Sequence, residues 1–203
     1  MERQTPRERR RARTAQDILD AALEIIAERG VNALSMREIA QRIEYSPSGL
    51  YEYYASKDEI LDALVEQGLA QLDRQIVHAT HGDTAAQQLL ECGLAYQAFA
   101  REHPHLYQLI FNHVARPAEL QTSLRGFAQN AAYGKLRTCI IEGIERREFV
   151  ISPESDVEQL VYYFWSLWHG LAMLRLSRAS RIEDIDEINH QVIQDAITRL
   201  SHT

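Results

Sequence analysis

Three helix starts follow one another closely in the first third of the chain. Ser35 lies three residues before Glu38, the spacing of a capping box, in which two side chains bond free N–H groups of the first helical turn. Ser46 precedes Pro47, and proline is favoured at the first helical position because its missing N–H would have no partner there. A third start at Ser56 follows at once. The segment therefore predicts a helix-turn-helix, which places a recognition helix in the DNA major groove.

The same segment resembles a known family. Two runs carry the resemblance, Ser-Met-Arg-Glu-Ile-Ala at 35–40 and Leu-Tyr-Glu-Tyr-Tyr-Ala-Ser-Lys-Asp-Glu-Ile-Leu at 50–61. They closely resemble the DNA-binding domain of TetR-type (tetracycline-repressor-like) transcriptional regulators, over about residues 14–64. The runs Glu-His-Pro-His-Leu-Tyr at 102–107 and Trp-His-Gly at 168–170 look like the regulatory domain of the WHG-type subgroup. The resemblance implies a DNA-binding regulator that responds to a ligand.

Beyond this segment, apolar residues recur at helical spacing, and no segment alternates as a strand does. We therefore expect an all-α fold, in which an N-terminal three-helix helix-turn-helix domain is joined by a long helix to a C-terminal helical ligand-binding and dimerisation domain. The predicted parts are a basic arm at 1–13 that is disordered without DNA, a DNA-binding domain at 14–60, and a regulatory and dimerisation domain at 61–203.

Caps, helix breakers and apolar periodicity predict where the helices begin and end. The predicted helices are Thr14–Arg29, 36–43, 47–53, one from Ser56 through Ile76, Thr84–Glu102, Pro104 to about Asn112, Arg116 to about Arg147, one after Ser152-Pro153-Glu154, and a last one from about Ile182. The helix that begins at Ser56 is too long for the DNA-binding domain alone. We expect it to continue into the second domain.

The charge of the chain is unevenly distributed. The whole chain has a formal net charge of −7, which by itself argues against a nucleic-acid partner. Residues 1–13, however, contain six arginines against two glutamates, and residues 59–203 contain 12 basic against 19 acidic residues. The acidic excess therefore lies outside the predicted DNA-binding end, where the arginine-rich arm can neutralise phosphates.

The resemblance assigns DNA contacts to the two short helices and their caps. It implies that the first turn of the recognition helix faces base edges, while tyrosine hydroxyls and a lysine ammonium reach phosphates and fix the register without reading sequence. The predicted DNA-binding residues are Ser35, Arg37, Ser46, Pro47, Ser48, Gly49, Tyr51, Tyr53 and Lys57. The alternative for Tyr51 and Tyr53 is that both are half-buried surface aromatics, and contact with DNA is the preferred interpretation.

Two further residues bear on how bases are read. The first turn of the recognition helix has no Asn, Gln or Arg, so Arg37 is the best candidate for a two-bond contact with guanine. A phosphate contact is an equally good interpretation of Arg37. Glu44 stands in the turn between the short helices, where the family usually has glycine. If that residue must be left-handed, glutamate costs about 1 kcal/mol more than glycine.

Aromatic and histidine side chains are frequent in the second domain. An apolar interior with a few polar tips is typical both of a small-molecule pocket between helices and of a packed core, so both interpretations stay open. Candidate contacts of an unidentified, apolar small-molecule ligand are Phe99, His103, Tyr107, Phe111, Tyr133, Trp165 and His169. Tyr107 and His169 lead, because a phenol and an imidazole on apolar helix faces need hydrogen-bond partners.

The last two predicted helices carry wide apolar stripes. Ile185, Ile188, Val192 and Leu200, or Leu167 and Leu171, would face water in a monomer. In TetR-like proteins these helices form a dimeric four-helix bundle, whereas periodicity alone is more often explained by an intramolecular core. Helix-turn-helix proteins generally bind two half-sites about 34 Å apart, which requires two copies. We therefore expect a homodimer on a palindromic operator in double-stranded DNA.

Other chemistries find little support in the residues. The chain has no phosphate-binding glycine loop and no G-x-S-x-G or H-E-x-x-H motif, so we expect neither an enzyme nor a cofactor. His103, His105 and His113 lack the spacing and the companions of a metal site. Cys92 and Cys139 are isolated in the sequence, which favours buried small hydrophobic residues over a redox pair.

The sequence also bears on location. No run of about 18 apolar residues occurs, and the arginine-rich N-terminus lacks the apolar stretch of a secretory signal. We therefore expect a cytoplasmic protein with no membrane partner. The predicted function is a ligand-responsive repressor that a small molecule releases from its operator. The alternatives are a transcriptional activator of the same fold and a helical protein-interaction module that does not bind DNA.

Overall fold

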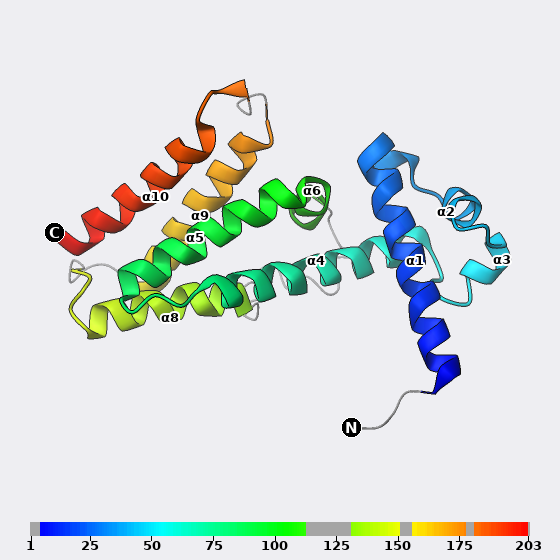
Figure 1. The fold of residues 1–203 in the computed structure, drawn as a ribbon, viewed down its shortest axis with the longest axis horizontal. Coiled ribbons are helices and arrows are strands. Elements are labelled where there is room, and N and C mark those ends of the chain that lie inside the picture. Colours follow the sequence, from blue (N-terminus) through cyan, green and yellow to red (C-terminus); the bar gives the residue numbers. More distant parts are fainter. Residues whose placement is uncertain (1–4, 113–130, 151–155, 178–180, 203) are drawn as a thin grey trace. The chain divides into compact units, whose positions relative to one another are not determined.

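A computed structural model describes residues 5–112, 131–150, 156–177 and 181–202. These residues form helices and no strand, which confirms the predicted all-α fold. The described helices are α1 (Pro6–Arg29), the short 3-10 helix η1 (Val31–Ala33), α2 (Met36–Arg42), α3 (Pro47–Leu50), α4 (Lys57–Ala79), α5 (Ala85–Glu102), α6 (Pro104–Asn112), α8 (Ala131–Glu145), α9 (Val157–Arg175) and α10 (Ile185–His202) (Figure 1). None of them is long and apolar enough to cross a membrane.

The first of two compact units is built around one apolar core. α1 contributes Ile18, Ala22 and Ile25, which recur at helical spacing and are completely buried. α2 adds Ile39 and α3 adds Leu50, both also completely buried. Apolar residues from the first half of α4 and from α6 complete the core: Ile60, Leu61, Leu64 and Leu109. A few large side chains therefore hold the two short helices in place.

The units do not follow the predicted boundary between residues 60 and 61. The first unit comprises Met1–Gly68 together with His105–Ala115, and the second comprises Leu69–Pro104 together with Arg116–Thr203. Leu64 and Leu109 explain the difference, because both are buried in the core that α1, α2 and α3 build. A single cut along the sequence cannot include a segment that returns to the first unit from a later position.

α1 begins well before the predicted Thr14. The Thr5 hydroxyl accepts a hydrogen bond from the Glu8 N–H at 3.3 Å, and the Glu8 carboxylate accepts one from the Thr5 N–H at 2.8 Å. This capping box, with Pro6 at the first helical position, starts the helix. The predicted disordered arm at 1–13 is therefore wrong for residues 6–13, and residues 1–4 lie outside the described part of the chain.

The recognition helix is shorter than predicted, whereas α2 ends within one residue of the predicted 36–43. α3 ends at Leu50 instead of continuing to Tyr53. Beyond Leu50 the Glu52 N–H bonds to the Gly49 carbonyl at 3.3 Å, and the Tyr53 N–H bonds to the Leu50 carbonyl at 2.9 Å. These i→i−3 bonds tighten the chain into turns and end the α-helical pattern.

In the second unit, α5 packs against α8, α9 and α10. Phe99 of α5 and Phe164 and Trp168 of α9 are among its largest fully buried side chains. These aromatic side chains form the core between α5 and α9, and Phe99, which the sequence left open between core and pocket, is part of that core.

Local caps decide where the later helices begin. α5 begins within one residue of the predicted Thr84, after a capping box between Thr84 and Gln87. α9 begins at Val157, after its own cap Asp156, rather than directly after Ser152-Pro153-Glu154, which lie outside the described residues. α10 begins at Ile185 rather than at about Ile182. Of the predicted helix at 116–147, only Ala131–Glu145 is described as α8, and residues 116–130 lie outside the description.

Candidate nucleic-acid interface and ligand-binding residues

The start of α2 is capped by Ser35. Its hydroxyl accepts a hydrogen bond from the Glu38 N–H at 3.2 Å. The Glu38 carboxylate forms an ion pair with Arg29 of α1, so the return bond of the predicted capping box is replaced by a link between the two helices. Arg42 at the other end of α2 bonds Glu28 of α1 at 2.6 Å, and this bond lowers the pKa of Glu28. Both ends of α2 are thereby tied to α1.

The turn after α2 has a left-handed residue at Glu44, with φ of 54°. The Tyr45 N–H bonds to the Ala40 carbonyl at 2.8 Å, and the Glu44 N–H bonds to the Gln41 carbonyl at 3.4 Å. This pair of bonds is the Schellman motif, in which the residue after the helix is usually glycine. Glu44 therefore has the left-handed backbone conformation in which glutamate is less stable than glycine, and its side chain is exposed.

Replacing Glu44 with glycine should raise the stability of the first unit by about 1 kcal/mol, because glycine avoids the left-handed penalty of about 1–2 kcal/mol and loses part of that gain to unfolded-chain entropy. Urea unfolding of the two proteins measures the difference. The matched control is Gln41→Gly, an exposed helical position where glycine should destabilise by about 1 kcal/mol. A lower midpoint for Glu44→Gly would contradict the strain at this turn.

The recognition helix α3 is capped by Ser46, whose hydroxyl accepts a hydrogen bond from the Gly49 N–H at 3.1 Å. The Ser48 hydroxyl lies 3.2 Å from that of Ser46. Pro47 and Ser48 are exposed, whereas Leu50 is fully buried. A Cβ atom at Gly49 would lie only 2.6 Å from the Tyr45 ring, so glycine lets that ring pack over the helix. The exposed face of α3 is therefore its small, polar first turn.

The predicted phosphate-binding residues surround this turn. Tyr51 directly after α3 is 56% exposed, and Lys57 at the start of α4 and Arg37 in α2 are also exposed. Tyr53 is half-buried, and its ring lies edge-on to that of Tyr45, with the centroids 6.3 Å apart. All nine predicted residues thus belong to one unit, at the ends of α2, α3 and α4.

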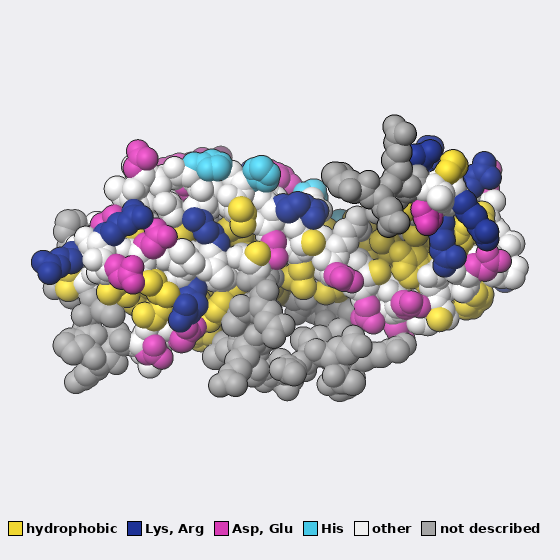
Figure 2. Space-filling model, turned by 90° about the horizontal axis from the view of Figure 1, so that it is seen from below, with side chains coloured by type: hydrophobic (Ala, Val, Ile, Leu, Met, Phe, Trp, Pro, Cys, Tyr) yellow, Lys and Arg dark blue, Asp and Glu magenta, His cyan; other side chains and the backbone are white. Residues whose placement is uncertain are grey.

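Arg11 of α1 also belongs to this surface, although it was not among the predicted DNA-binding residues. Its guanidinium donates a hydrogen bond to the Glu52 carbonyl at 3.0 Å and lies 5.5 Å above the centre of the Tyr53 ring. The basic start of α1 therefore contacts the turn that follows α3. Arg7, Arg10 and Arg13 are exposed on the same part of α1, and Figure 2 shows a group of basic side chains on this unit. The run of arginines at residues 7–13 is the sequence feature from which a contribution of α1 to this surface could have been predicted.

Five of the predicted ligand residues lie in the second unit. The polar atoms of three of them already have hydrogen-bond partners in the protein. The His103 Nε2 atom lies 2.8 Å from the Gln71 amide nitrogen, and the Tyr133 hydroxyl donates to Glu158 at 3.1 Å. The His169 Nδ1 atom lies 3.2 Å from the Tyr96 hydroxyl. Burial lowers the pKa of His169, which favours its neutral form. The remaining two of the five are Phe99, which is buried, and Trp165, which is half-buried.

Tyr107 and Phe111, the other two predicted ligand residues, belong to the first unit. Tyr107 is completely buried, and its ring centroid lies 4.7 Å from that of Phe111. One unsatisfied group was not predicted. The Trp168 indole N–H is buried without a hydrogen-bond partner among the described residues, and it faces Gly93, where a Cβ atom would lie 2.7 Å away.

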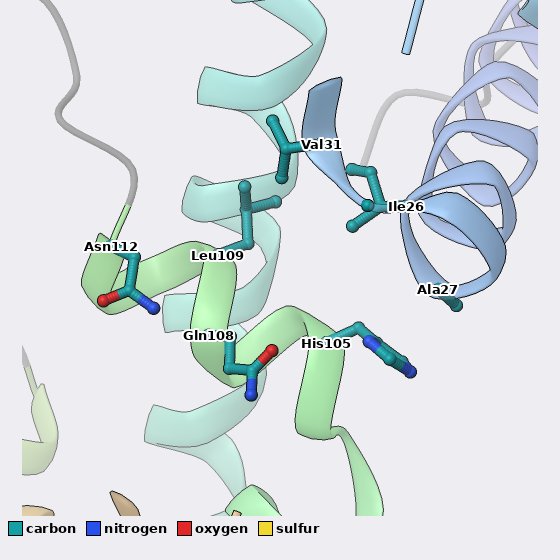
Figure 3. A pocket seen from close by; sticks show the side chains of 8 residues that line it. Ile26, Ala27, Val31, His105, Gln108, Leu109 and Asn112 are labelled. Carbon is teal, nitrogen blue, oxygen red and sulfur yellow. The ribbon is translucent and has the colours of Figure 1, made fainter. Parts of the chain in front are cut away.

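A pocket of about 500 Å³ lies between the end of α1 and α6 within the first unit. His105, Gln108 and Asn112 line it from one face of α6, and Ile26 and the backbone near Gly30 line it from α1 and η1 (Figure 3). None of the predicted ligand residues lines this pocket. His105 was expected to be neither a metal ligand nor a pocket residue, although its spacing from Gln108 and Asn112 places all three polar residues on one helical face.

The faces of α9 and α10 differ from the prediction at one position. Ile188 and Val192 are 44% and 36% exposed, as expected for a monomer, whereas Ile185 is buried within its own chain. Leu167, Leu171 and Leu200 are half-buried. Other large apolar residues on these two helices are exposed as well: Tyr162, Tyr163 and Leu174. The second unit therefore presents apolar surface on both of its last helices.

Two parts of the chain match known protein families. Residues 18–64 match the profile of "Bacterial regulatory proteins, tetR family". Residues 89–196, more than half of the chain, match the profile "Tetracyclin repressor-like, C-terminal domain". The assignment to the WHG-type subgroup stays a prediction, because neither match bears on it.

Individual relatives agree with these matches. The HTH-type transcriptional repressor KstR2 of Mycobacterium tuberculosis is 31% identical over 154 residues, which cover 73% of this chain and 74% of that protein. The HTH-type transcriptional regulator BetI of Rhizobium meliloti is 24% identical over 147 residues, covering 70% and 68%. A protein of unknown function from Rhodococcus sp. RHA1 has a similar fold, with a TM-score of 0.78, 20% identity and coverage of 93% and 95%. The chain therefore belongs to the TetR family and is a DNA-binding transcriptional regulator.

Proposed function

We propose that the protein is a dimeric repressor that binds a palindromic operator and is released from it by a small molecule. The observation that carries this proposal is the exposed surface formed by the first turn of α3 and the starts of α2 and α4, beside a basic α1. Relatives with either activity exist: KstR2 is named a repressor, and FasR of Mycolicibacterium smegmatis, 32% identical over 107 residues, is named an activator. An activator therefore remains the second candidate.

On this proposal Pro47, Ser48 and Gly49 face the base edges, and Tyr51 and Lys57 bind phosphates. Small residues let the backbone of α3 approach the groove closely, and the exposed hydroxyl and ammonium groups are suitable phosphate partners. Arg11 stabilises this surface by its contacts with Glu52 and Tyr53 in the turn after α3. A protein bound to the chromosome works where the chromosome lies, so we propose a cytoplasmic location.

Lys57→Ala should weaken binding to every DNA sequence by a similar factor and flatten the log–log dependence of affinity on salt by about 0.9, because one phosphate is no longer neutralised. Tyr51→Phe should also weaken binding uniformly, by about 0.5–1.5 kcal/mol, but leave the salt slope unchanged, because its hydroxyl is neutral. Titrations of operator and unrelated DNA at several salt concentrations distinguish these outcomes. A changed sequence preference in either variant would refute the phosphate role.

Arg37→Ala separates the two interpretations of Arg37. If the side chain reads guanine, discrimination at one base pair should fall by about 1–3 kcal/mol while the other positions keep theirs. If it binds phosphate, affinity should fall equally for all sequences and the salt slope should flatten. Binding to a set of operators with single base-pair changes gives the answer, and the exposed Glu52→Gln serves as a control for nonspecific charge effects.

The homodimer is proposed from the exposed apolar faces of α9 and α10. Side chains such as Tyr163, Leu174, Ile188 and Val192 are exposed in a single chain, and several large exposed apolar side chains on two neighbouring helices favour an interface. A two-fold dimer presents two copies of α3 to two half-sites, which is why the operator is proposed to be palindromic. DNA selected from a random pool by the purified protein would reveal that symmetry, and a non-repeated site would contradict it.

The ligand is proposed to be small and largely apolar, and to bind in the second unit. The buried indole N–H of Trp168, which has no hydrogen-bond partner among the described residues and lies next to Phe164 and Tyr96, supports this, since a buried donor of this kind gains a hydrogen bond from a ligand oxygen. If the ligand weakens operator binding by some factor, the operator must weaken ligand binding by the same factor. A reporter placed behind the operator separates repression from activation.

A further inference from the structure

Two thiols lie together in the core of the second unit. Cys92 of α5 and Cys139 of α8 are both completely buried and in the reduced state. The Cys139 sulfur lies 3.7 Å from the Oε1 atom of Gln88, which precedes Cys92 by one helical turn on the same face of α5. α5 and α8 pack against each other, and the two thiols are close enough for each to shift the pKa of the other. The cysteines that look isolated in the sequence are therefore neighbours.

Polar groups surround the pair, although it is buried. The Thr80 hydroxyl lies 3.3 Å from the Cys92 sulfur and 2.7 Å from the Ile76 carbonyl. The Lys135 ammonium donates to Gln88 at 3.1 Å, so a positive charge lies beside the pair. The neighbouring Cys139 thiol lowers the pKa of Cys92, with Thr80 and Lys135 contributing, whereas the neighbouring Cys92 thiol and burial raise the pKa of Cys139. Cys92 is therefore the thiol that ionises first.

We propose that Cys92 and Cys139 are an oxidation site at which a peroxide forms a disulfide that links α5 to α8. The Cys92 thiolate attacks one peroxide oxygen, so that an S–O bond forms, the O–O bond breaks, and hydroxide leaves and takes up the proton that Cys92 had lost. The Cys139 sulfur then attacks the sulfenic sulfur, an S–S bond forms and the S–O bond breaks. The departing hydroxide takes the Cys139 proton, so that one peroxide becomes two waters.

Access to the pair requires only a small movement. Gln88 contacts Cys139, Lys135 contacts Gln88, and both of these long side chains are half-exposed. Hydrogen peroxide is little larger than water, so we expect rotation of these two side chains to admit it. A disulfide needs the two Cα atoms within about 7 Å, a separation that facing residues of two packed helices such as α5 and α8 can reach.

The test uses the full chain and needs no DNA. The reduced protein is treated with hydrogen peroxide, denatured, alkylated with iodoacetamide and weighed by mass spectrometry. The untreated protein should gain two alkyl groups. The oxidised protein should gain none, be lighter by two hydrogen atoms, regain both sites after dithiothreitol, and stay a single chain on a non-reducing denaturing gel. A tryptic peptide that joins the Cys92 and Cys139 segments identifies the bond.

Two serine variants test the order of the steps. In Cys139→Ser, Cys92 should stop at sulfenic acid and be labelled by dimedone added together with the denaturant. In Cys92→Ser, Cys139 should react more slowly and resist the label. The wild-type measurement stands even if a variant fails to fold. Two thiols that remain alkylatable after the peroxide is consumed would overturn the proposal, as would disulfides only between chains or sulfinic acid without a disulfide. None of these outcomes bears on operator binding.

Discussion

Val192→Glu should convert the dimer into monomers and lower operator affinity about 10²–10⁴-fold, although the residue lies in the last helix. Val192 is 36% exposed on α10 and, in the proposed dimer, is covered by the second copy. A carboxylate at the centre of an apolar interface loses its water without gaining a partner, which costs several kcal/mol. Each monomer would still read one half-site, but without the gain from binding two half-sites together.

Sedimentation velocity at micromolar concentration and operator titration measure the two effects. Ile188→Glu should behave like Val192→Glu, because the two residues are one turn apart on the same face. Gln194→Glu is the matched control, since it places the same charge at an exposed position on the other side of α10. A wild-type protein that sediments as a monomer would contradict the proposed interface, and so would dimers of both glutamate variants.

Leu50→Ala should have the opposite pattern of effects, with loss of DNA binding and an intact dimer. Leu50 is completely buried in the core of the first unit and is the buried side chain that anchors α3. Truncating a buried leucine costs about 2–5 kcal/mol, a large part of the stability of a small domain. With four helical residues, α3 has too little helical hydrogen bonding to keep its position without that anchor.

The expected result is an early unfolding transition of the first unit and operator affinity close to that for unrelated DNA, with the sedimentation coefficient of the dimer unchanged. Leu50→Met keeps most of the volume and should cost less than about 1.5 kcal/mol, so its operator binding should survive. Equal loss of binding in the two variants would point to a direct DNA contact by Leu50 instead. Unchanged binding by Leu50→Ala would show that α3 is held by other contacts.

Much of the first unit was determined by the sequence itself. The starts of α2, α3 and α4 lie where Ser35, Ser46 and Ser56 predict them, because a cap acts over only three residues. Even the unfavourable residue of the turn, Glu44, could be identified, since the geometry of a tight turn depends on the conformations of its own few residues. The same local pattern was sufficient to identify the family. The start of α1 at Pro6 depends on an equally local signal, the capping box of Thr5 and Glu8, which was not recognised in the arginine-rich segment.

Contacts between distant segments could be decided only by the tertiary structure. Periodicity shows which side chains share a helical face, but not what that face meets. Ile185 is buried in its own chain while Ile188 and Val192 of the same apolar stripe are exposed. Leu109 returns to the core of the first unit, Arg11 reaches the turn after α3, and Cys139 lies beside the α5 face that carries Cys92. Each pairing depends on how helices pack, and packing follows from the combined shape of many side chains rather than from any short segment.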